Sequence, residues 1–263
     1  MIGEIAAVES SDTVRFSRFR ERASMASLKE VFRRPGAQKR ALMQPGRIHY
    51  LHIGKTAGNQ IKTLCNAIEA NTPEIRFSLH GHSMQLRRLP SQAEYFFSIR
   101  RPETRFVSAF YERKRQGRGG RNTWSEAERL AFLEFEHATN LADAVFAEGA
   151  RGQLARSAMH SIQHLRQFQA SWFQSLGFFL HTRPPIAIIR QEKLDEDFNR
   201  FCERLGLAEP PSIDITPDQA KVTKYDEIPA LSELGIANLR QWYAVDNAFY
   251  SDCVNWLESP GVR

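Results

Sequence analysis

The pattern of hydrophobic residues changes at Arg47. Beyond it, short runs rich in β-branched and aromatic residues alternate with longer runs of helical period. The short runs predict strands and are, in order, RIHYLHI (47–53), IRFSLHG (75–81), EYFFSIR (94–100) and PPIAIIR (184–190). Helical runs follow them, the first at about 59–70 and the third beginning with TRFVSAFYERKR. Strands that alternate with helices predict a parallel sheet covered by helices.

The rest of the domain is helical in period. Residues from Trp124 to about Leu176 form a long insertion before the last predicted strand. After that strand, apolar residues share one face of a helix that Gly206 ends: Leu194, Phe198, Phe201, Cys202, Leu205 and Leu207. The C-terminal stretch from Pro229 predicts one long helix or a broken pair. The predicted fold class is α/β, a P-loop-type three-layer fold with a central parallel sheet of about five strands and a helical insertion at about 124–176.

Residues 1–46 differ in composition from the domain expected at 47–263. The stretch RFSRFRERASMASLKEVFRRPGAQKR is rich in arginine, and its loosely periodic apolar residues predict one or two helices. A basic helix would suit peripheral contact with an anionic membrane, or with another subunit. A solvated extension packed by a few aromatics is the more common case. The sequence is compatible with a homodimer but does not argue for one.

Composition narrows the functional classes. The hydrophobic content of 42% can fill a core. No stretch approaches the roughly 18 apolar residues of a membrane span, and the N-terminus lacks the apolar block of a secretory signal, so we expect a cytoplasmic protein. Cys65, Cys202 and Cys253 lack metal-ligand spacing, which predicts small buried hydrophobes. The net charge of +6 favours an anionic partner: nucleic acid, a membrane surface or a phosphorylated cofactor.

The first candidate site is the loop in LHIGKTAGNQ, after the first predicted strand. A strand that runs through such a loop into a helix suits phosphate, because the first-turn amides have no helical acceptors and the helix dipole favours negative charge. Lys55 adds a full positive charge. The ATP-type signature GxxxxGK[ST] would require glycine at position 49, where this chain has His49, so the full Walker A signature is absent.

Phosphoryl transfer with magnesium would also need an acidic ligand at the end of a nearby strand. The candidate strands instead run into FFSIRRPE and IAIIRQE, with arginine in that place. We therefore predict no metal site. A sulfuryl donor would suit a loop of this kind, because its terminal group carries one negative charge that protein cations and amides can balance unaided.

The second candidate site is SIRRPETRFVSAFY at 98–111. Arg100 ends a strand and Ser108 lies on the helix that follows, so both can turn toward one anion. Arginine binds phosphate through two hydrogen bonds, and a serine hydroxyl can add a third. Taken alone, such a pair is more often a surface arginine and a helical serine.

In this order the two loops resemble those of the sulfotransferases that use 3′-phosphoadenosine-5′-phosphosulfate (PAPS), and the likeness is closest to the carbohydrate-type branch and its bacterial relatives. In that family a loop like HxPKTxGT cradles the 5′-phosphosulfate, and one like RDPxxRxxSxY binds the 3′-phosphate. The resemblance covers roughly residues 47–253. It implies these cofactor-binding residues: Lys55, Thr56, Ala57, Gly58, Asn59, Gln60, Arg100, Arg105 and Ser108.

The chain departs from the family pattern in both loops. Gly54 replaces the usual proline and Arg101 the usual aspartate. Asn59 and Gln60 replace the usual pair of hydroxyl residues. Backbone amides and Lys55 then remain as the main expected contacts to the phosphosulfate.

Sulfuryl transfer needs a group that takes the proton of the acceptor and positive charge at the departing phosphate. Lys55 fits the second role. His80 and His82, after the second predicted strand, are candidate bases because the ordinary pKa of histidine is about 6.5. Relatives in the carbohydrate branch are similar here, with a Gly-His pair that corresponds to Gly81-His82, so we favour His82 over His80. For His52, beside the loop, we favour a structural role.

The resemblance implies an enzyme that transfers a sulfuryl group from PAPS, without a metal, to a hydroxyl or less commonly an amine of a small-molecule, carbohydrate or glycolipid-type acceptor. The basic loop RKRQGRGGR (113–121) would steer an anionic glycan or lipid head group, or is simply solvated. Trp124, Trp172 and Phe173 would line the acceptor or adenine pocket, although aromatics at helical spacing are usually core.

Two other classes compete with this hypothesis. A nucleotide-dependent kinase with a degenerate P-loop would need an acidic metal ligand near the first loop. A non-catalytic anion or nucleic-acid binder would bind oligonucleotides with a steep salt dependence and would tolerate the loss of His82 and Lys55. We expect no nucleic-acid partner, because a single RGG triplet is thin support for RNA binding.

Overall fold

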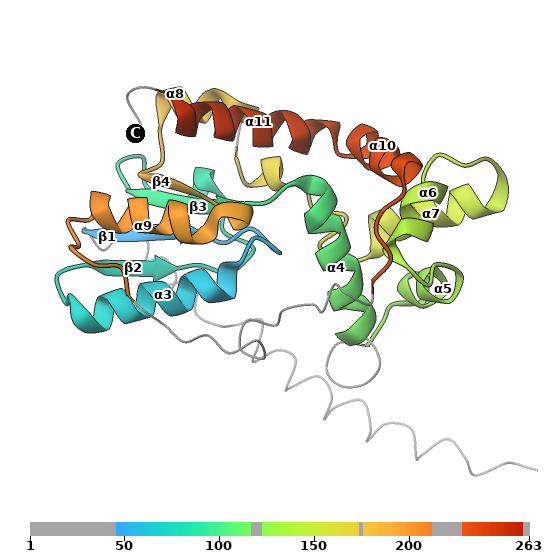
Figure 1. Ribbon diagram of the computed structural model, residues 1–263, viewed down its shortest axis with the longest axis horizontal. Helices are drawn as coiled ribbons and strands as arrows, with labels where there is room; N and C mark the ends of the chain where they lie inside the picture. Colours follow the sequence, from blue (N-terminus) through green and yellow to red (C-terminus); the bar gives the residue numbers. More distant parts are fainter. Residues whose placement is uncertain (1–45, 117–122, 174–175, 212–227, 260–263) are drawn as a thin grey trace, which may run out of the picture. The chain divides into compact units, whose positions relative to one another are not determined.

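The computed structural model describes residues 46–116, 123–173, 176–211 and 228–259 (Figure 1). The basic extension expected at 1–46, except for its last residue, lies outside the described residues, as do positions 117–121 of the basic loop. The chain from Pro45 onward forms one compact unit. No helix among the described residues is long and apolar enough to cross a membrane.

The core of the unit is a parallel sheet. Its strands are β1 (Arg47–Leu51), β2 (Arg76–Leu79), β3 (Tyr95–Ile99) and β4 (Ala187–Arg190). They are ordered β2-β1-β3-β4, and every pairing is parallel. All four runs predicted as strands form strands, but the expected total of about five was too high for the described part of the chain.

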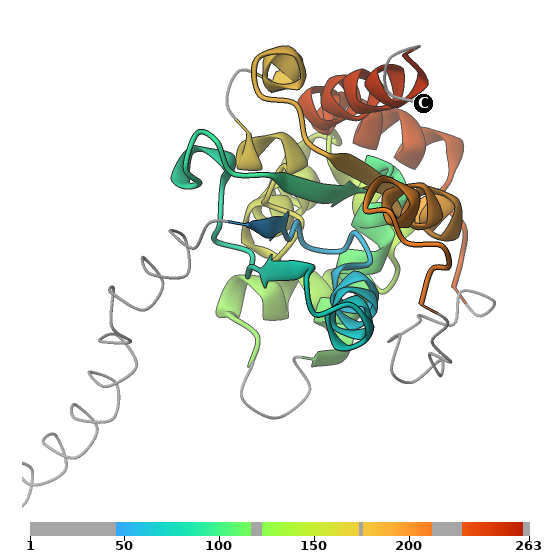
Figure 2. The same cartoon turned by 90° about the vertical axis from the view of Figure 1, so that its left-hand side faces the viewer.

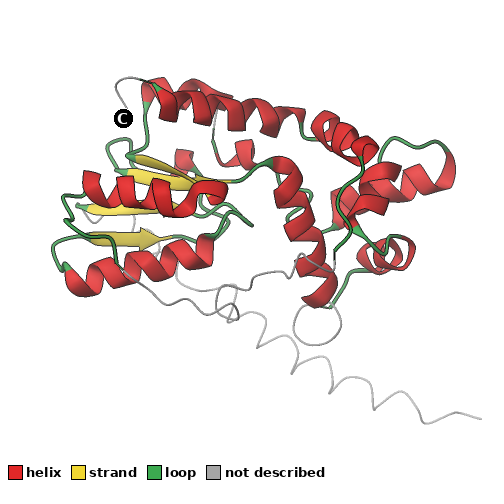
Figure 3. Ribbon diagram, viewed as in Figure 1, coloured by secondary structure: helices red, strands yellow, loops and turns green. Residues whose placement is uncertain are grey.

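Helices surround the sheet and extend beyond the carboxyl ends of its strands (Figure 3). The α-helices are α3 (Gly58–Asn71), α4 (Pro102–Gln116), α5 (Glu126–Glu134), α6 (Ala138–Ala144), α7 (Gly149–Ser161), α8 (Phe179–Thr182), α9 (Leu194–Arg204), α10 (Glu233–Trp242) and α11 (Ala244–Glu258). Short 3₁₀ turns are η1 (Leu86–Arg88), η2 (Gln169–Trp172), η3 (Leu176–Phe178) and η4 (Gln191–Lys193).

Neighbouring residues of β3 show how the two faces of the sheet are covered, because successive side chains of a strand point to opposite faces. The ring of Phe96 lies 4.5 Å from that of Phe201 on α9, and this face also holds the buried residues of α3. The ring of Phe97 lies 4.4 Å from Phe173 and 6.3 Å from Phe249 on α11. Figure 2, which looks along the strands, shows α3 and α9 together on one side. The predicted three-layer arrangement is confirmed.

The helical insertion has a core of its own. Residues of α5, α6 and α7 pack against one side of α4 and against α10. Trp124 packs on Phe132 within this group, with ring centroids 4.9 Å apart. Trp172 and Phe173 are buried in the core. Trp172 and Phe173 therefore fill the interior, as their helical spacing favoured, and Trp124 packs half-buried against it.

Three further expectations are confirmed. The apolar face predicted for 194–207 packs on the sheet, and Gly206 adopts φ of +75°, which glycine tolerates at a helix end. The C-terminal stretch is a broken pair, α10 and α11, with the break at Tyr243. Cys65, Cys202 and Cys253 are free and buried.

Candidate functional site

The loop between β1 and α3 has the backbone of an anion site. Lys55 and Ala57 adopt φ of 70° and 65°, a conformation that residues other than glycine rarely adopt without a functional reason. No side chain caps the N-terminus of α3. The amides of Lys55, Thr56 and Ala57 donate to no acceptor in the described part of the chain. These amides and the positive end of the α3 dipole are available to an anion.

A chain of buried hydroxyl groups fixes this loop to the sheet. Thr56 Oγ1 lies 2.8 Å from the carbonyl oxygen of Ile53 and 2.7 Å from Ser98 Oγ. The hydroxyl of Tyr50 lies 2.7 Å from Ser98 Oγ. Because the carbonyl can only accept, the Thr56 hydroxyl donates to it and accepts from Ser98, which in turn accepts from Tyr50. The Thr56 side chain therefore holds the loop, and its amide remains for a ligand.

Other residues predicted to bind the cofactor begin α3. Gly58 is the first residue of that helix, and Asn59 and Gln60 complete its first turn. Asn59 is exposed and Gln60 half-buried. A Cβ on residue 58 would lie 1.8 Å from Nε2 of His52, so only glycine fits beneath that ring.

The second loop joins β3 to α4. The backbone of Arg100 exchanges hydrogen bonds with the Gln169 side chain, at 3.0 and 2.8 Å. Its side-chain Nε donates to Thr104 Oγ1 at 3.1 Å. The amide of Arg101 donates to Glu192 Oε1 at 2.6 Å, so a carboxylate already occupies part of this helix N-terminus. Arg190 also ends a predicted strand. It forms an ion pair with Asp197, in which Nη2 lies 2.7 Å from Oδ1.

Helix α4 brings the two loops together. Arg105 Nε donates to the carbonyl oxygen of Gly54 at 2.9 Å, and Lys55 Nζ lies 2.8 Å from Glu112 Oε2. Arg105, Ser108 and Glu112 follow helical spacing, so they share the face of α4 that meets the first loop. Arg105 is only 2% exposed and supports the loop from within. Ser108 is buried on the same face.

His82 lies beside the first loop, with one ring nitrogen held by the backbone. Its Nδ1 is 3.1 Å from the carbonyl oxygen of His52, and the two rings are 4.2 Å apart. A carbonyl only accepts, so Nδ1 carries the proton and the neutral ring has its lone pair on Nε2. Burial lowers the pKa of His82, and the hydrogen bond to His52 opposes that shift. Burial also lowers the pKa of His52, to about 3, consistent with a structural role.

His80 has a different environment from His82. Its Nε2 lies 2.9 Å from Nδ1 of His49, so these two ring nitrogens share a proton. Burial, with a smaller contribution from His49, lowers the pKa of His80 to about 4. This pairing occupies a ring nitrogen that a base would need, whereas Nε2 of His82 makes no hydrogen bond within the described chain.

The structure adds two residues that the sequence analysis missed. Glu112 pairs with Lys55, and its helical spacing from Arg105 was the available signal. His164, from the segment after α7, contacts His82 with ring centroids 5.2 Å apart. A Cβ on residue 54 would lie 2.5 Å from His164 Nδ1, so a larger residue would overlap that ring. No local pattern distinguishes His164 in the sequence.

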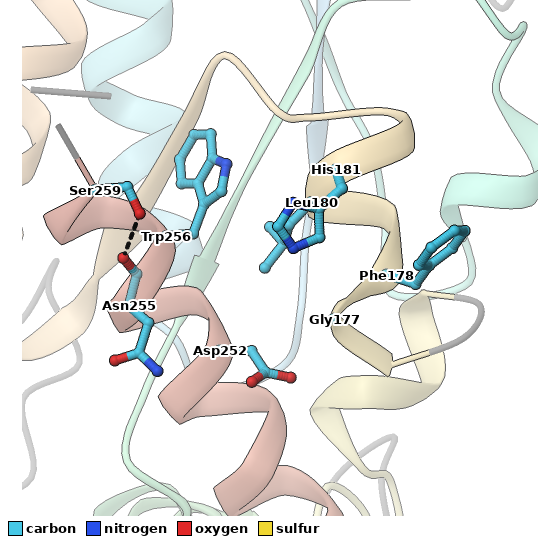
Figure 4. Close-up of a pocket in the computed structure, with 8 residues that line it drawn as sticks. All are labelled: Gly177, Phe178, Leu180, His181, Asp252, Asn255, Trp256 and Ser259. Carbon is cyan, nitrogen blue, oxygen red and sulfur yellow. Dashed lines mark hydrogen bonds between the residues drawn. The ribbon is translucent and has the colours of Figure 1, made fainter. Parts of the chain in front are cut away.

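Two grooves lie away from these residues. A groove of about 480 Å³ between η3, α8 and α11 is lined by residues that include His181, Asp252 and Trp256 (Figure 4). A second, of about 610 Å³, lies along α9. Neither contains a residue of the two loops. Within the described residues, no group of three or more histidine, cysteine or acidic side chains is arranged to hold a metal ion.

The chain was compared with protein-family models, curated proteins and solved structures, and none matched.

Proposed function

We propose that the protein is a PAPS-dependent sulfotransferase that modifies a hydroxyl, or less commonly an amine, of a carbohydrate or glycolipid-type acceptor. The proposal rests on one observation: helix α4, which follows the second loop, also contacts the first loop. Arg105 reaches Gly54, and Glu112 reaches Lys55, from the helix that begins at Pro102, shortly after Arg100. Both loops can then contact one elongated anion with phosphate at either end.

The residues of the first loop fit a phosphosulfate. Amides without protein acceptors, an uncapped helix and Lys55 supply hydrogen-bond donors and positive charge in one place. PAPS, when bound, would supply an activated sulfuryl group. Glu112 does not contribute to such binding, because it neutralises Lys55 in the ligand-free site. Binding of an anion by Lys55 therefore competes with this ion pair.

The described side chains suit three roles in an in-line displacement. His82 Nε2 accepts the proton of the acceptor hydroxyl as its oxygen bonds to sulfur. Lys55 and the loop amides bind the phosphate oxygen released when the sulfur–oxygen bond breaks. Arg100 and Ser108 bind the 3′-phosphate and fix the register of the nucleotide.

A transfer assay tests this function. Full-length protein is incubated with PAPS carrying ³⁵S and pooled saccharide acceptors, in the presence of chelator. We expect label to enter an acceptor, and Lys55→Ala to reduce the rate much more than the exposed-lysine control Lys193→Ala. A parallel assay replaces PAPS with γ-labelled ATP and the chelator with magnesium. Phosphate transfer there, with no transfer of sulfur label in the first assay, would instead identify a kinase.

A further inference from the structure

One carboxylate oxygen lies between two groups that can carry positive charge. Glu112 Oε2 is 2.8 Å from Lys55 Nζ and 3.9 Å from His164 Nε2. The first distance is a close ion pair, whereas the second is too long for a hydrogen bond. Lys55 is therefore the nearer of these two partners in the ligand-free site.

His164 is held in place by the loop itself. Its ring fills the space above Gly54, and its Nδ1 is buried without a hydrogen-bond partner. The residue adopts φ of 69°, a strained conformation for a side chain of this size. A strained residue with an unpaired polar atom beside a ligand loop indicates a functional constraint rather than simple packing.

The charges around His164 explain its protonation state before ligand binds. Burial lowers the pKa of His164 to about 4, although Glu112 opposes the shift. The other groups that face it are His82, Arg105, Lys55 and His52, and the positive charges of Arg105 and Lys55 disfavour protonation of His164. His164 is therefore neutral at pH 7, and Lys55 balances Glu112.

An anion bound to the first loop changes the charges that surround Glu112 and His164. A phosphate group brings about 1.5 to 2 negative charges at pH 7. Lys55 turns to the anion, which deprives Glu112 of that partner just as more negative charge arrives. A proton on His164 would compensate both, because the imidazolium lies beside Glu112 and close to the loop.

We propose that Glu112 and His164 form a proton-linked positioning pair: when an anion binds the first loop, His164 takes up a proton and pairs with Glu112, which releases Lys55 to the ligand. In the sulfuryl-transfer reaction, which this assignment presupposes, Lys55 thereby reaches the departing phosphate. The carboxylate stays paired instead of repelling the ligand.

The test is calorimetry of full-length protein with 3′-phosphoadenosine-5′-phosphate (PAP) at pH 7 in buffers of different ionisation enthalpy. The dependence of the observed heat on that enthalpy gives the number of protons taken up. Wild type should take up measurably more protons on binding than His164→Gln or Glu112→Gln. Because the ligand's own ionisation contributes equally to all proteins, the difference isolates the pair.

One histidine variant serves as the control. His160→Gln changes an exposed histidine of α7 and should keep the wild-type uptake. Loss of the uptake in His160→Gln, or its persistence in His164→Gln, overturns the assignment. Circular dichroism confirms that each variant is folded.

Inorganic pyrophosphate separates this inference from the proposed function. If PAP binds with the same uptake in wild type and His164→Gln, the pair is wrong and the nucleotide site stands. If pyrophosphate binds with the expected uptake but PAP does not, the pair stands and the sulfotransferase assignment fails. If neither anion binds, both are wrong.

Discussion

The Nδ1 atom of His82 lies 3.1 Å from the backbone carbonyl of His52, at the point where β1 leads into the first loop. This contact fixes the tautomer of His82 and ties the candidate base to the same segment that carries Lys55. The position of the His82 ring relative to the first loop is therefore set by a hydrogen bond to the backbone of β1's continuation. The ring of His52, packed on Gly58, supports the arrangement from the other side.

We expect His82→Gln to lower kcat on the order of a hundredfold or more while leaving the Kd for PAP nearly unchanged, because a general base acts on the acceptor and not on the nucleotide. His80→Gln is the matched control and should have a much smaller effect, since His80 is engaged with His49. Steady-state rates and calorimetry measure both quantities. A larger loss of kcat in His80→Gln would reverse the assignment.

We expect Gly54→Ala to destabilise the protein by about 1–3 kcal/mol, because the new methyl group would overlap His164. The φ of Gly54 is not positive, so backbone strain does not contribute. The same change in a His164→Ala background should cost much less. Urea unfolding of the four proteins gives the coupling energy.

Gly81→Ala is the control for that cycle, since a Cβ there meets nothing within 4 Å. It should change the free energy of unfolding by less than about 0.5 kcal/mol. Additive costs of Gly54→Ala and His164→Ala would show that the two residues do not contact each other.

Arg100→Ala should weaken PAP binding about ten- to a hundredfold, the value of one charge-assisted hydrogen bond of about 1.5–3 kcal/mol. The loss should be absent for AMP, which has no 3′-phosphate. Arg87→Ala removes the same charge from an exposed position and should leave both affinities unchanged. Equal losses for PAP and AMP would mean that Arg100 acts only on loop structure.

Stability should fall as pH drops from about 6.5 toward 4. Burial lowers the folded-state pKa of His52 to about 3 and those of His80 and His164 to about 4, from 6.5. The unfolded chain therefore binds more protons in this window, so acid favours unfolding. His164→Gln should reduce the slope of the unfolding free energy against pH by up to about 1.4 kcal/mol per pH unit. His160→Gln should leave that slope unchanged. Urea unfolding at pH 7 and pH 5 measures it, and a flat wild-type profile would contradict the inferred environments.

The sequence was sufficient for the architecture because its signals are local. Period-two and period-3.6 patterns identified every strand in the described residues and the apolar face of α9. The parallel order then placed Lys55, His82 and Arg100 at one edge of the sheet, since the carboxyl ends of parallel strands lie together.

The sequence was not sufficient for contacts made between distant segments. Thr56 was expected to bind the cofactor, but its hydroxyl is used by Ile53 and Ser98. His164 comes from the insertion, and its contact with Gly54 joins residues far apart in the chain. Burial and pairing of this kind depend on tertiary packing, which no local pattern encodes.

Calorimetry of the full-length protein with PAP, AMP and ATP, in chelator, shows whether both loops bind one nucleotide. PAP should bind clearly more tightly than AMP or ATP, because only PAP offers phosphates to the loop of Lys55 and to Arg100 together. Equal affinity for PAP and AMP, or no binding of PAP, would mean that the two loops do not share a ligand.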